Sequence, residues 1–387
     1  MRAAGFGVDI AGAGFRPTID LRVANGVART NNSTTRARTE RDHEDPQSIF
    51  LYRFESSLTL SQMLFDGFGT ASRRNSAMAR QQGATFQVMG VEEGVALRAV
   101  SAYLSVLQGR ELVALGEAYL GAHERVLLGL RAQLEGGAGT QADVDQAQGR
   151  LALAHATVIQ FKGGLADAEA GFREAVGSRP AELVMPMPRP SQLPASADDA
   201  VAEALKSHPG LKALAESARA LEFDVRAAGA TGYPRVSLDL MGTRSENAGG
   251  TKGPTGDATA MLTITYNLYR GGAEKATLDA TRALLNESRL RQEESGRLVE
   301  QGIRVAFNAH DVSQARMPAL EDALKSAQDA RKQFDDRFEA GDAKLIDLLG
   351  VEDQLFQASG GVVSGRTSTT LSHYQILGAM GRLRSSL

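Results

Sequence analysis

Acidic residues that follow glycine-containing turns are the best candidates for chemistry in this sequence. Asp143 comes just after the turn GGAGT, and Asp347 comes just after AGDAK. A carboxylate in the first turn of a helix can cap free N–H groups and interacts favourably with the helix dipole. The same carboxylate, repeated around a symmetry axis, would form an acidic ring that favours cations in a pore. Neither interpretation involves a catalytic reaction.

Other residue types give no sign of an active site. The chain has no cysteine, which excludes disulfides, thiolate zinc sites and a cysteine nucleophile. Its six histidines are scattered without a metal-binding spacing: His43, His123, His155, His208, His310 and His373. No nucleophile and base stand at a catalytic spacing, so we expect no enzyme activity, no cofactor and no metal. The formal net charge of −3 gives no field that would favour nucleic acid.

Two polar segments have simple interpretations. GGTKGPTG, from Gly249, lacks the spacing of a phosphate-binding loop and is expected to be a surface loop. Arg73 and Arg74, near the start of a long predicted helix, either lie near lipid headgroups or form a solvated basic pair.

The elements that must position the acidic residues occur twice in the chain. LTLSQMLFDG at Leu58 returns as LTITYNLYRG at Leu262, an offset of 204 residues, and the same offset carries Asp143 onto Asp347. Self-similarity over such a length predicts a repeated fold. PTIDL at Pro17 matches PRVSL at Pro234, with an offset of 217. That offset places the counterpart of Asp198 about 20 residues before Met1, so we expect the chain to start inside the first repeat, with any signal peptide missing.

Four segments alternate apolar and polar residues, which predicts strands with two different faces. We place these strands at about 18–27, 50–65, 235–243 and 258–269. In the first, Ile19, Leu21 and Val23 alternate with Thr18, Asp20 and Arg22. Residues 28–48 and 244–255 are polar or glycine-rich and are expected to be loops.

Helical periodicity occupies most of the remaining sequence. We predict helices at about 68–136, 141–176, 199–230, 272–339 and 345–382, with an interruption near Pro209 and a kink at Pro318. A helix of about 69 residues would be roughly 100 Å long. The segment 141–176 carries a heptad seam that predicts tight antiparallel packing on the preceding helix: Val144, Ala147, Leu151, Ala154, Val158, Phe161, Leu165, Ala168 and Phe172.

The predicted organisation is two tandem repeats, each a strand pair followed by a long antiparallel helical hairpin. The first repeat covers 1–177, a proline-rich linker covers 178–198, and the second repeat covers 199–387. Four two-faced strands cannot close a barrel, and a sheet that spans a membrane must be closed. Two chains would supply eight strands, which usually enclose a filled interior, and three chains would supply twelve, which can leave a lumen. Alternation alone also fits a soluble sheet, but the long hairpin after each strand pair favours the shared barrel.

In this order the motifs resemble the TolC family of outer-membrane exit ducts. The resemblance rests on PTIDL, SLTLSQMLFDG, EGGAGTQADV, YNLYRGG and EAGDAKLIDLL, and it extends from Pro17 to the closing LGAMGRL. It implies a mostly α fold with β strands, a homotrimer with a twelve-stranded β-barrel in the outer membrane, and a helical tunnel in the periplasm. SSLTLSQMLFDG and YNLYRGG, together with Pro318, most resemble the branch that serves type I secretion.

The resemblance also implies roles for residues at the two turns. Asp347 matches an aspartate of the family's entrance constriction, while Gly350 stands where a second aspartate occurs. Asp143 matches an acidic residue of a gate-holding network whose arginine partner falls on Ala343, next to Lys344. Phe338 stands at the position of a tyrosine. The pore or entrance residues are therefore Asp347, Asp143, Lys344 and Phe338, and the adaptor-docking tips are Gly137, Gly139, Gly341 and Asp342.

The functional expectation is an outer-membrane channel-tunnel that exports substrates across the periplasm and outer membrane, for type I protein secretion. Its partners would be a periplasmic adaptor (membrane fusion) protein, an inner-membrane ABC transporter or efflux pump, and outer-membrane lipid. Two alternatives remain open. One is a duct of the same family for drug or small-molecule efflux, and the other is a periplasmic coiled-coil scaffold, which leaves the four strands without a purpose.

Overall fold

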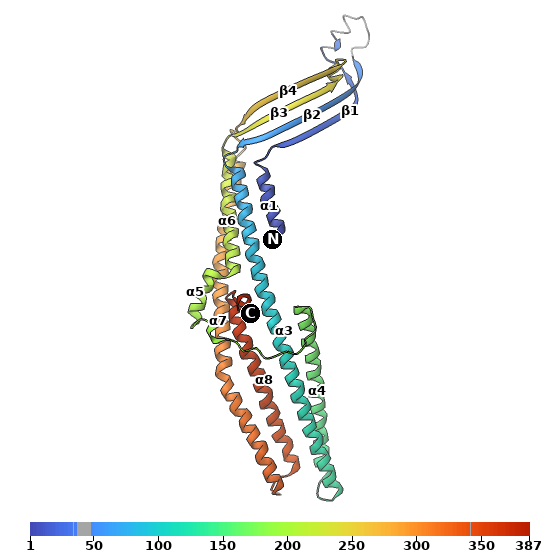
Figure 1. Ribbon diagram of the computed structural model, residues 1–387, viewed down its shortest axis with the longest axis vertical. Coiled ribbons are helices and arrows are strands. Elements are labelled where there is room, and N and C mark those ends of the chain that lie inside the picture. Colours follow the sequence, from blue (N-terminus) through green and yellow to red (C-terminus); the bar gives the residue numbers. More distant parts are fainter. Residues whose placement is uncertain (34, 37–47, 341) are drawn as a thin grey trace. The chain divides into compact units, whose positions relative to one another are not determined.

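The structure, a computed structural model, describes residues 1–33, 35–36, 48–340 and 342–387 (Figure 1). The chain forms two compact units, and each takes segments from both halves of the sequence. The first unit comprises Met1–Phe86 and Lys212–Glu293, and the second comprises Gln87–Leu211 and Glu294–Leu387. Among the described residues, no helix has a stretch both long and apolar enough to cross a membrane.

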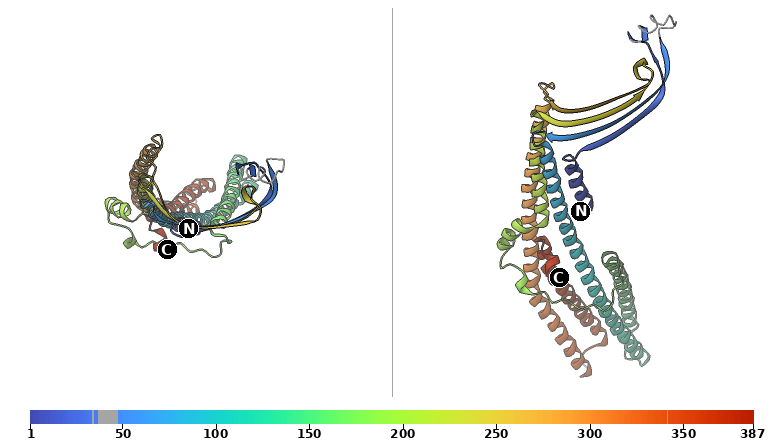
Figure 2. Two further views of the ribbon diagram at one scale, coloured as in Figure 1. Left: turned by 90° about the horizontal axis from the view of Figure 1, so that it is seen from above. Right: turned by 45° about the horizontal axis from the view of Figure 1, so that its top comes forward.

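The first unit contains one antiparallel sheet in which the strand order follows the chain. Its strands are β1 (Thr18–Thr30), β2 (Ile49–Phe65), β3 (Arg235–Glu246) and β4 (Pro254–Thr265). The two strand pairs from the two repeats thus join edge to edge through β2 and β3, and Figure 2 shows the four strands side by side in a curved sheet. All four strands are predicted by the alternating sequence pattern.

The predicted bounds of the last strand were wrong, for a reason visible in the pairing. Alternation continues to Leu268, but β4 ends at Thr265, because its partner β3 begins at Arg235, directly opposite Thr265. The loop expected at 244–255, before β4, is shorter in the structure because both flanking strands extend into it. Glu246 pairs with Pro254, and Asn247 closes the turn with its side chain, which accepts from Gly253 N–H at 3.0 Å. The surface loop expected at GGTKGPTG therefore ends in β4.

Each strand pair connects to a long helix through two residues of positive φ. Gly67 (φ +67°) and Phe68 (φ 65°) connect β2 to α3 (Gly69–Glu135). Gly271 (φ +63°) and Gly272 (φ +82°) connect β4 to α7 (Ala273–Glu339) at the repeat-related positions. A left-handed backbone is readily accessible to glycine, so the repeated glycine in LFDG and LYRG reflects one junction geometry used twice. The unit also includes α1 (Arg2–Ala13) and most of α6 (Pro209–Gly229).

The second unit is built from two antiparallel helical hairpins. The first joins α3 to α4 (Gln141–Val176), and the second joins α7 to α8 (Leu348–Ala379). The helix predicted at 199–230 divides into α5 (Ala197–Ser207) and α6, as Pro209 predicts, while α7 continues through Pro318. The helix predicted at 345–382 is instead a 3-10 turn, Leu345–Asp347, then α8, and finally α9 (Leu383–Ser386), because Gly381 adopts φ +69°.

Both hairpins pack a glycine of one helix against a large side chain of the other, but in opposite senses. In the first, Gly116 of α3 faces Phe161 of α4, whose ring lies 3.0 Å from the position of an added Cβ. At the repeat-related positions of the second hairpin, Leu320 of α7 faces Gly365 of α8, with 2.8 Å between the added Cβ and Leu320 Cδ1. The heptad prediction of an antiparallel partner on α3 is confirmed, with Phe161 on the seam.

The proline-rich segment between the repeats is fastened to the first hairpin. The Tyr103 hydroxyl of α3 donates to the Val184 carbonyl at 2.7 Å and accepts from Val184 N–H at 2.8 Å. Arg110 donates to the Ala181 carbonyl at 2.9 Å. Although the sequence predicts only an extended linker here, the structure gives it fixed backbone contacts along α3.

Candidate functional site

One face of the sheet is predominantly apolar across all four strands. Residues directly opposite each other in an antiparallel pair share a face. Leu21 lies opposite Leu58, Leu60 opposite Leu240, and Leu238 opposite Leu262, so the apolar positions of all four strands coincide. Leu21 is 70% exposed and Leu262 is 63% exposed. Large contiguous apolar patches are rare on soluble monomers and mark sites that contact a membrane or another protein.

The opposite face of the sheet is polar and internally hydrogen-bonded. Asp239 of β3 lies opposite Ser61 of β2, and its carboxylate accepts from Ser61 Oγ at 2.6 Å and from Ser237 Oγ at 2.8 Å. Asp20 and Arg22 of β1 share this face, through pairing with Thr59 and Ser57. The sheet therefore has one mainly apolar face and one mainly polar face.

Both edges of the sheet are open within the described part of the chain. β1 pairs only with β2, and β4 pairs only with β3. Unpaired strand edges can pair with another chain unless they are blunted, covered or closed by further strands.

At the first helical tip, a threonine provides the cap. Thr140 Oγ1 accepts from Asp143 N–H at 3.2 Å, and its hydroxyl donates to the Asp143 carboxylate at 2.7 Å. Asp143 therefore does not cap the helix itself, as the sequence suggested, but lies in its first turn and is held by the cap. Gly137 is exposed with φ +73°, and an added Cβ there meets nothing within 4 Å. Gly139 is tighter, since its added Cβ would lie 3.0 Å from Leu134 N.

At the second tip, Asp347 is the last residue of the 3-10 turn and precedes α8. It is exposed, and its side chain makes no cap hydrogen bond. The capping interpretation of Asp347 is therefore wrong, and the geometry leaves its carboxylate in solvent. Lys344 is exposed as well, whereas Ala343 packs against the apolar core. Gly341 lies outside the described residues.

The remaining predicted tip residues lie at the end of α7. The Asp342 N–H donates to the Arg337 carbonyl at 2.9 Å, and Arg337 Nη2 donates to the Asp342 carbonyl at 3.1 Å. Phe338 is 38% exposed, with its ring stacked on that of the buried Phe334 at 6.2 Å between centroids.

One apolar core holds the two tips together within the second unit. It draws on all four helices: Val126, Leu127 and Leu130 of α3, Val144 and Ala147 of α4, Phe334 of α7, and Leu348 and Leu349 of α8. Leu345, in the second tip, lies 2.5 Å from the position of an added Cβ on Gly129 of α3. The two turns that hold the predicted tip residues are thus joined to the same apolar core.

A polar network that the sequence patterns do not predict joins the two hairpins. Asp353 of α8 accepts from the Tyr119 hydroxyl of α3 at 2.5 Å and forms an ion pair with Arg150 of α4. The buried His123 of α3 has its Nε2 3.6 Å from the same carboxylate. Burial and the hydrogen bond to Asp353 raise the pKa of the Tyr119 phenol. A second pair, Arg331 to Glu352 at 2.5 Å, joins α7 to α8 within one hairpin.

The described residues hold no group of three or more His, Cys, Asp or Glu side chains placed to bind a metal ion. Two buried histidines, His310 and His373, lie 6.1 Å apart between ring centroids and contact Ser372 and Gln192 rather than a carboxylate. His43 lies outside the described residues.

A two-faced sheet with open edges, whose strands lead directly into long helical hairpins, defines a class of channel proteins of the outer membrane. The sequence profile described as "Outer membrane efflux protein" matches residues 1–178 and 200–382. The chain belongs to this family, which is the TolC family of the sequence resemblance. It is a transport protein of the outer membrane and not an enzyme.

Individual relatives agree with this family membership. The chain is 29% identical over 330 residues to the outer membrane efflux protein BepC of Brucella suis biovar 1, covering 84% of this chain and 72% of BepC. It is 24% identical over 366 residues to the alkaline protease secretion protein AprF of Pseudomonas aeruginosa, covering 92% of this chain and 73% of AprF. The Campylobacter jejuni CmeC outer membrane channel has the same fold, with a TM-score of 0.81 at 14% identity, covering 99% of this chain and 81% of CmeC.

Proposed function

We propose that three copies of this chain close a twelve-stranded barrel in the outer membrane, and that their helical hairpins line a periplasmic tunnel. The observation that carries this proposal is the predominantly apolar face over four strands, together with the two open edges. Closure removes the unpaired edges, turns the apolar face to lipid and turns the polar face to a water-filled lumen. Four strands are too few to do this alone.

Two neighbouring residues in the middle of β3 give a matched test. Leu240 is on the apolar face and pairs with Leu60, whereas Met241 is on the polar face and pairs with Thr59. A lysine facing lipid near the bilayer midplane costs about 2–4 kcal/mol, and one facing the lumen costs little. We expect Leu240→Lys to reduce membrane insertion and trimer yield, and Met241→Lys to leave both near the wild-type level.

Mass measurement of the detergent-solubilised protein and heat-modifiable migration on gels would report the trimer. A stable monomer that retains its full strand content, or equal effects of the two lysine substitutions, would contradict the barrel.

Within the family we propose a role in type I protein secretion. The motifs SSLTLSQMLFDG and YNLYRGG support it, and so does the similarity to AprF, a protein named for alkaline protease secretion, over 92% of this chain. In this role the partners are a periplasmic adaptor and an inner-membrane ABC transporter. Efflux of small molecules is the second candidate, because BepC, at 29% identity, is named an efflux protein.

Deletion of the gene separates the two roles. Secretion predicts that a specific large protein disappears from the culture medium while sensitivity to dyes, detergents and antibiotics changes little. Efflux predicts the reverse pattern. Complementation with the wild-type gene serves as the control in both assays.

We further propose that Asp347 contributes to an acidic ring at the tunnel entrance, with Asp143 nearby. Exposure of Asp347 and its lack of a cap hydrogen bond support this proposal, because helix capping does not account for the carboxylate. Acidic rings favour cations. We expect Asp347→Asn to lower cation preference in planar bilayers under a salt gradient, with little change in stability. An unchanged reversal potential would remove Asp347 from the pore.

The turns around Gly137 and Gly341, with Gly139 and Asp342, are proposed to dock the adaptor. Open space around Gly137 supports this, since nothing lies within 4 Å of an added Cβ. Gly137→Trp should abolish export but preserve barrel insertion. Gly137→Asn is the matched control, because asparagine tolerates a left-handed backbone and adds little bulk. Export by the tryptophan variant would place the docking site elsewhere.

A further inference from the structure

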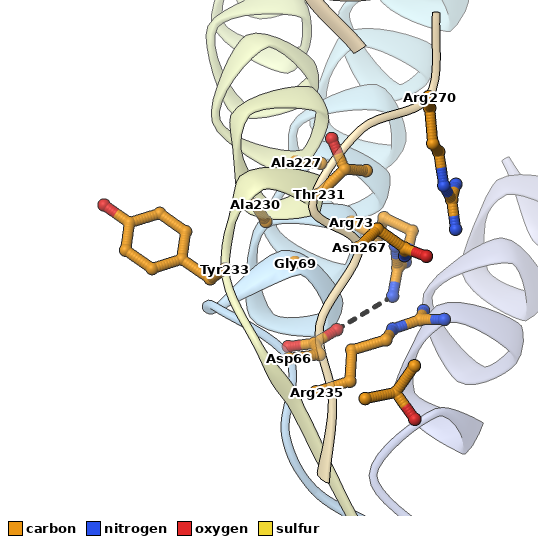
Figure 3. A pocket seen from close by; sticks show the side chains of 11 residues that line it. Asp66, Gly69, Arg73, Ala227, Ala230, Thr231, Tyr233, Arg235, Asn267 and Arg270 are labelled. Carbon is orange, nitrogen blue, oxygen red and sulfur yellow. Dashed lines mark hydrogen bonds and ion pairs between the residues drawn. The ribbon is translucent and has the colours of Figure 1, made fainter. Parts of the chain in front are cut away.

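Three arginines converge on one pocket at the base of the sheet, where the strands meet the helices (Figure 3). The pocket is about 240 Å³ and lies wholly within the first unit. Arg73 comes from the first turns of α3, Arg235 is the first residue of β3, and Arg270 lies just before α7. Thr231, Thr265 and Asn267 add neutral hydrogen-bonding groups to its lining.

The only lining carboxylate among the described residues does not neutralise this charge. Asp66 is buried, and its Oδ2 accepts from Thr70 N–H at 2.7 Å, from the Thr70 hydroxyl at 2.8 Å and from Arg73 at 3.1 Å. Arg73 Nη2 also donates to the Thr70 hydroxyl at 2.8 Å, so Asp66 and Thr70 together hold this end of the guanidinium. The Arg73 side chain remains 50% exposed and lines the pocket.

The other two arginines have weak partners or none. Arg270 lies 3.8 Å from Glu274, beyond hydrogen-bonding distance, and its side chain is 55% exposed. Within the described part of the chain, no ion pair involves Arg235. Figure 3 shows Arg73, Arg235, Asn267 and Arg270 extending to the same side, whereas the ring of Tyr233 extends the opposite way.

The repeat shows that this concentration of charge is not a by-product of the fold. Arg270 occupies the position that Asp66 holds in the first repeat, and Arg235 occupies the position of Thr18. At the same junction of strand and helix, the first repeat thus has the carboxylate of Asp66 and the hydroxyl of Thr18, whereas the second repeat has two guanidinium groups.

The strand register assigns the pocket to the polar face of the sheet. Arg235 pairs with Thr265, and both share the face of Ser237 and Asp239, two and four residues along β3. In the proposed channel this face lines the lumen, so the ligand must arrive through water and not from the bilayer.

We propose that this pocket is a lumenal binding site for a soluble oxyanion of the phosphate type. A guanidinium group can donate two parallel hydrogen bonds to the oxygens of one phosphate, whereas a lysine ammonium acts as a point charge. Several guanidinium groups around one pocket therefore favour a phosphate-type oxyanion. Three guanidiniums against Asp66 in the lining and Glu274 beside Arg270 leave a net positive pocket that has room for a phosphate group and its first waters. The lumenal assignment rests on the proposed function, whereas the oxyanion chemistry rests on the pocket alone.

The test measures binding directly on the full chain in detergent. Inorganic phosphate is titrated by isothermal calorimetry against chloride at matched ionic strength, because screening would otherwise mask the difference. We expect saturable binding of one phosphate per chain. Arg235→Gln and Arg270→Gln should each weaken it about ten- to hundredfold, the loss expected for one charge-assisted contact. Arg22→Gln is the matched control, since Arg22 lies on the same face but outside the pocket, and should bind as the wild type.

Each contrary outcome is informative. Equal binding by all variants, or equal competition by chloride, would overturn the proposal in favour of diffuse attraction. Binding of phosphatidylglycerol in mixed micelles without binding of inorganic phosphate would overturn the soluble ligand in favour of a lipid headgroup. Pore formation by the wild type is measured separately in planar bilayers. A pore-forming protein that binds no phosphate refutes this pocket alone, and a phosphate-binding protein that forms no pore refutes the proposed channel alone.

Discussion

The carboxylate of Asp353, on α8, contacts side chains of α3 and α4. Its removal should therefore weaken the contact between the two hairpins. In Asp353→Ala the Tyr119 hydroxyl and the Arg150 guanidinium both lose their acceptor. A hydrogen bond to a charged group is worth about 1.5–3 kcal/mol. The Asp353 side chain is 30% exposed, so solvent screens the ion pair and reduces its contribution. Together these effects predict a loss of about 2–4 kcal/mol from the free energy of unfolding of the second unit.

The assay compares Asp353→Ala with Asp335→Ala. Asp335 pairs with Arg331 on its own helix and is 54% exposed, so its loss should cost at most about 0.5 kcal/mol. Urea unfolding of both variants measures the stabilities, and planar-bilayer recordings measure conductance. If the network holds the hairpins together in the proposed tunnel, Asp353→Ala should show higher or more frequently open conductance and Asp335→Ala should not.

A double-mutant cycle with Tyr119→Phe checks the contact itself. The two substitutions should be clearly non-additive, because both remove the same hydrogen bond. Equal stabilities of Asp353→Ala and Asp335→Ala, or strict additivity in the cycle, would refute the reasoning.

Three further outcomes follow from local geometry. Gly365→Leu should destabilise the second hairpin by about 1–3 kcal/mol, because the new side chain meets Met317 and Leu320; thermal unfolding checks this, and a simultaneous Leu320→Ala should recover part of the loss. Thr140→Ala should cost about 1 kcal/mol, the usual value of a helix cap, seen as faster hydrogen exchange at the start of α4. Burial lowers the pKa of His310 and His373. As the pH falls below about 6.5, these histidines take up protons in the unfolded chain before they do so in the folded chain. The free energy of unfolding measured in urea should therefore decrease as the pH falls. This decrease should be less steep in His373→Gln.

The sequence predicted the fold well where a pattern repeats along the chain. Period-two alternation located all four strands, and the 204-residue offset located both tips, because each is a local signal that occurs twice. The end of β4 could not be predicted, since it depends on where its partner begins. Alternation in YNL continues past Thr265, but no strand lies opposite.

In the candidate site, too, local positions follow from the sequence and long-range contacts do not. The first-turn position of Asp143 is visible in the sequence, and Thr140, three residues earlier, is the capping residue in the structure. The Asp353 network could not be found from spacing. Its members are separated by 31 and 203 residues along the chain, and only the tertiary fold brings them together. One signal was available, because the repeat places glycine at position 149 where the second copy has Asp353.

The opposed placement of glycine in the two hairpins bears on how the chain avoids mispairing its own helices. Two similar hairpins in one polypeptide offer four helices that could exchange partners during folding. Pairing α3 with α8 in the wrong hairpin would set Gly116 against Gly365 and leave a void, while pairing α7 with α4 would force Leu320 against Phe161. At these two positions, only the helix pairs that are neighbours along the chain match a small residue with a large one. Because Gly116 and Gly365 lie on opposite helices of the two hairpins, each helix fits its own partner better than it fits the corresponding helix of the other repeat. A perfect repeat would not distinguish the two partners in this way.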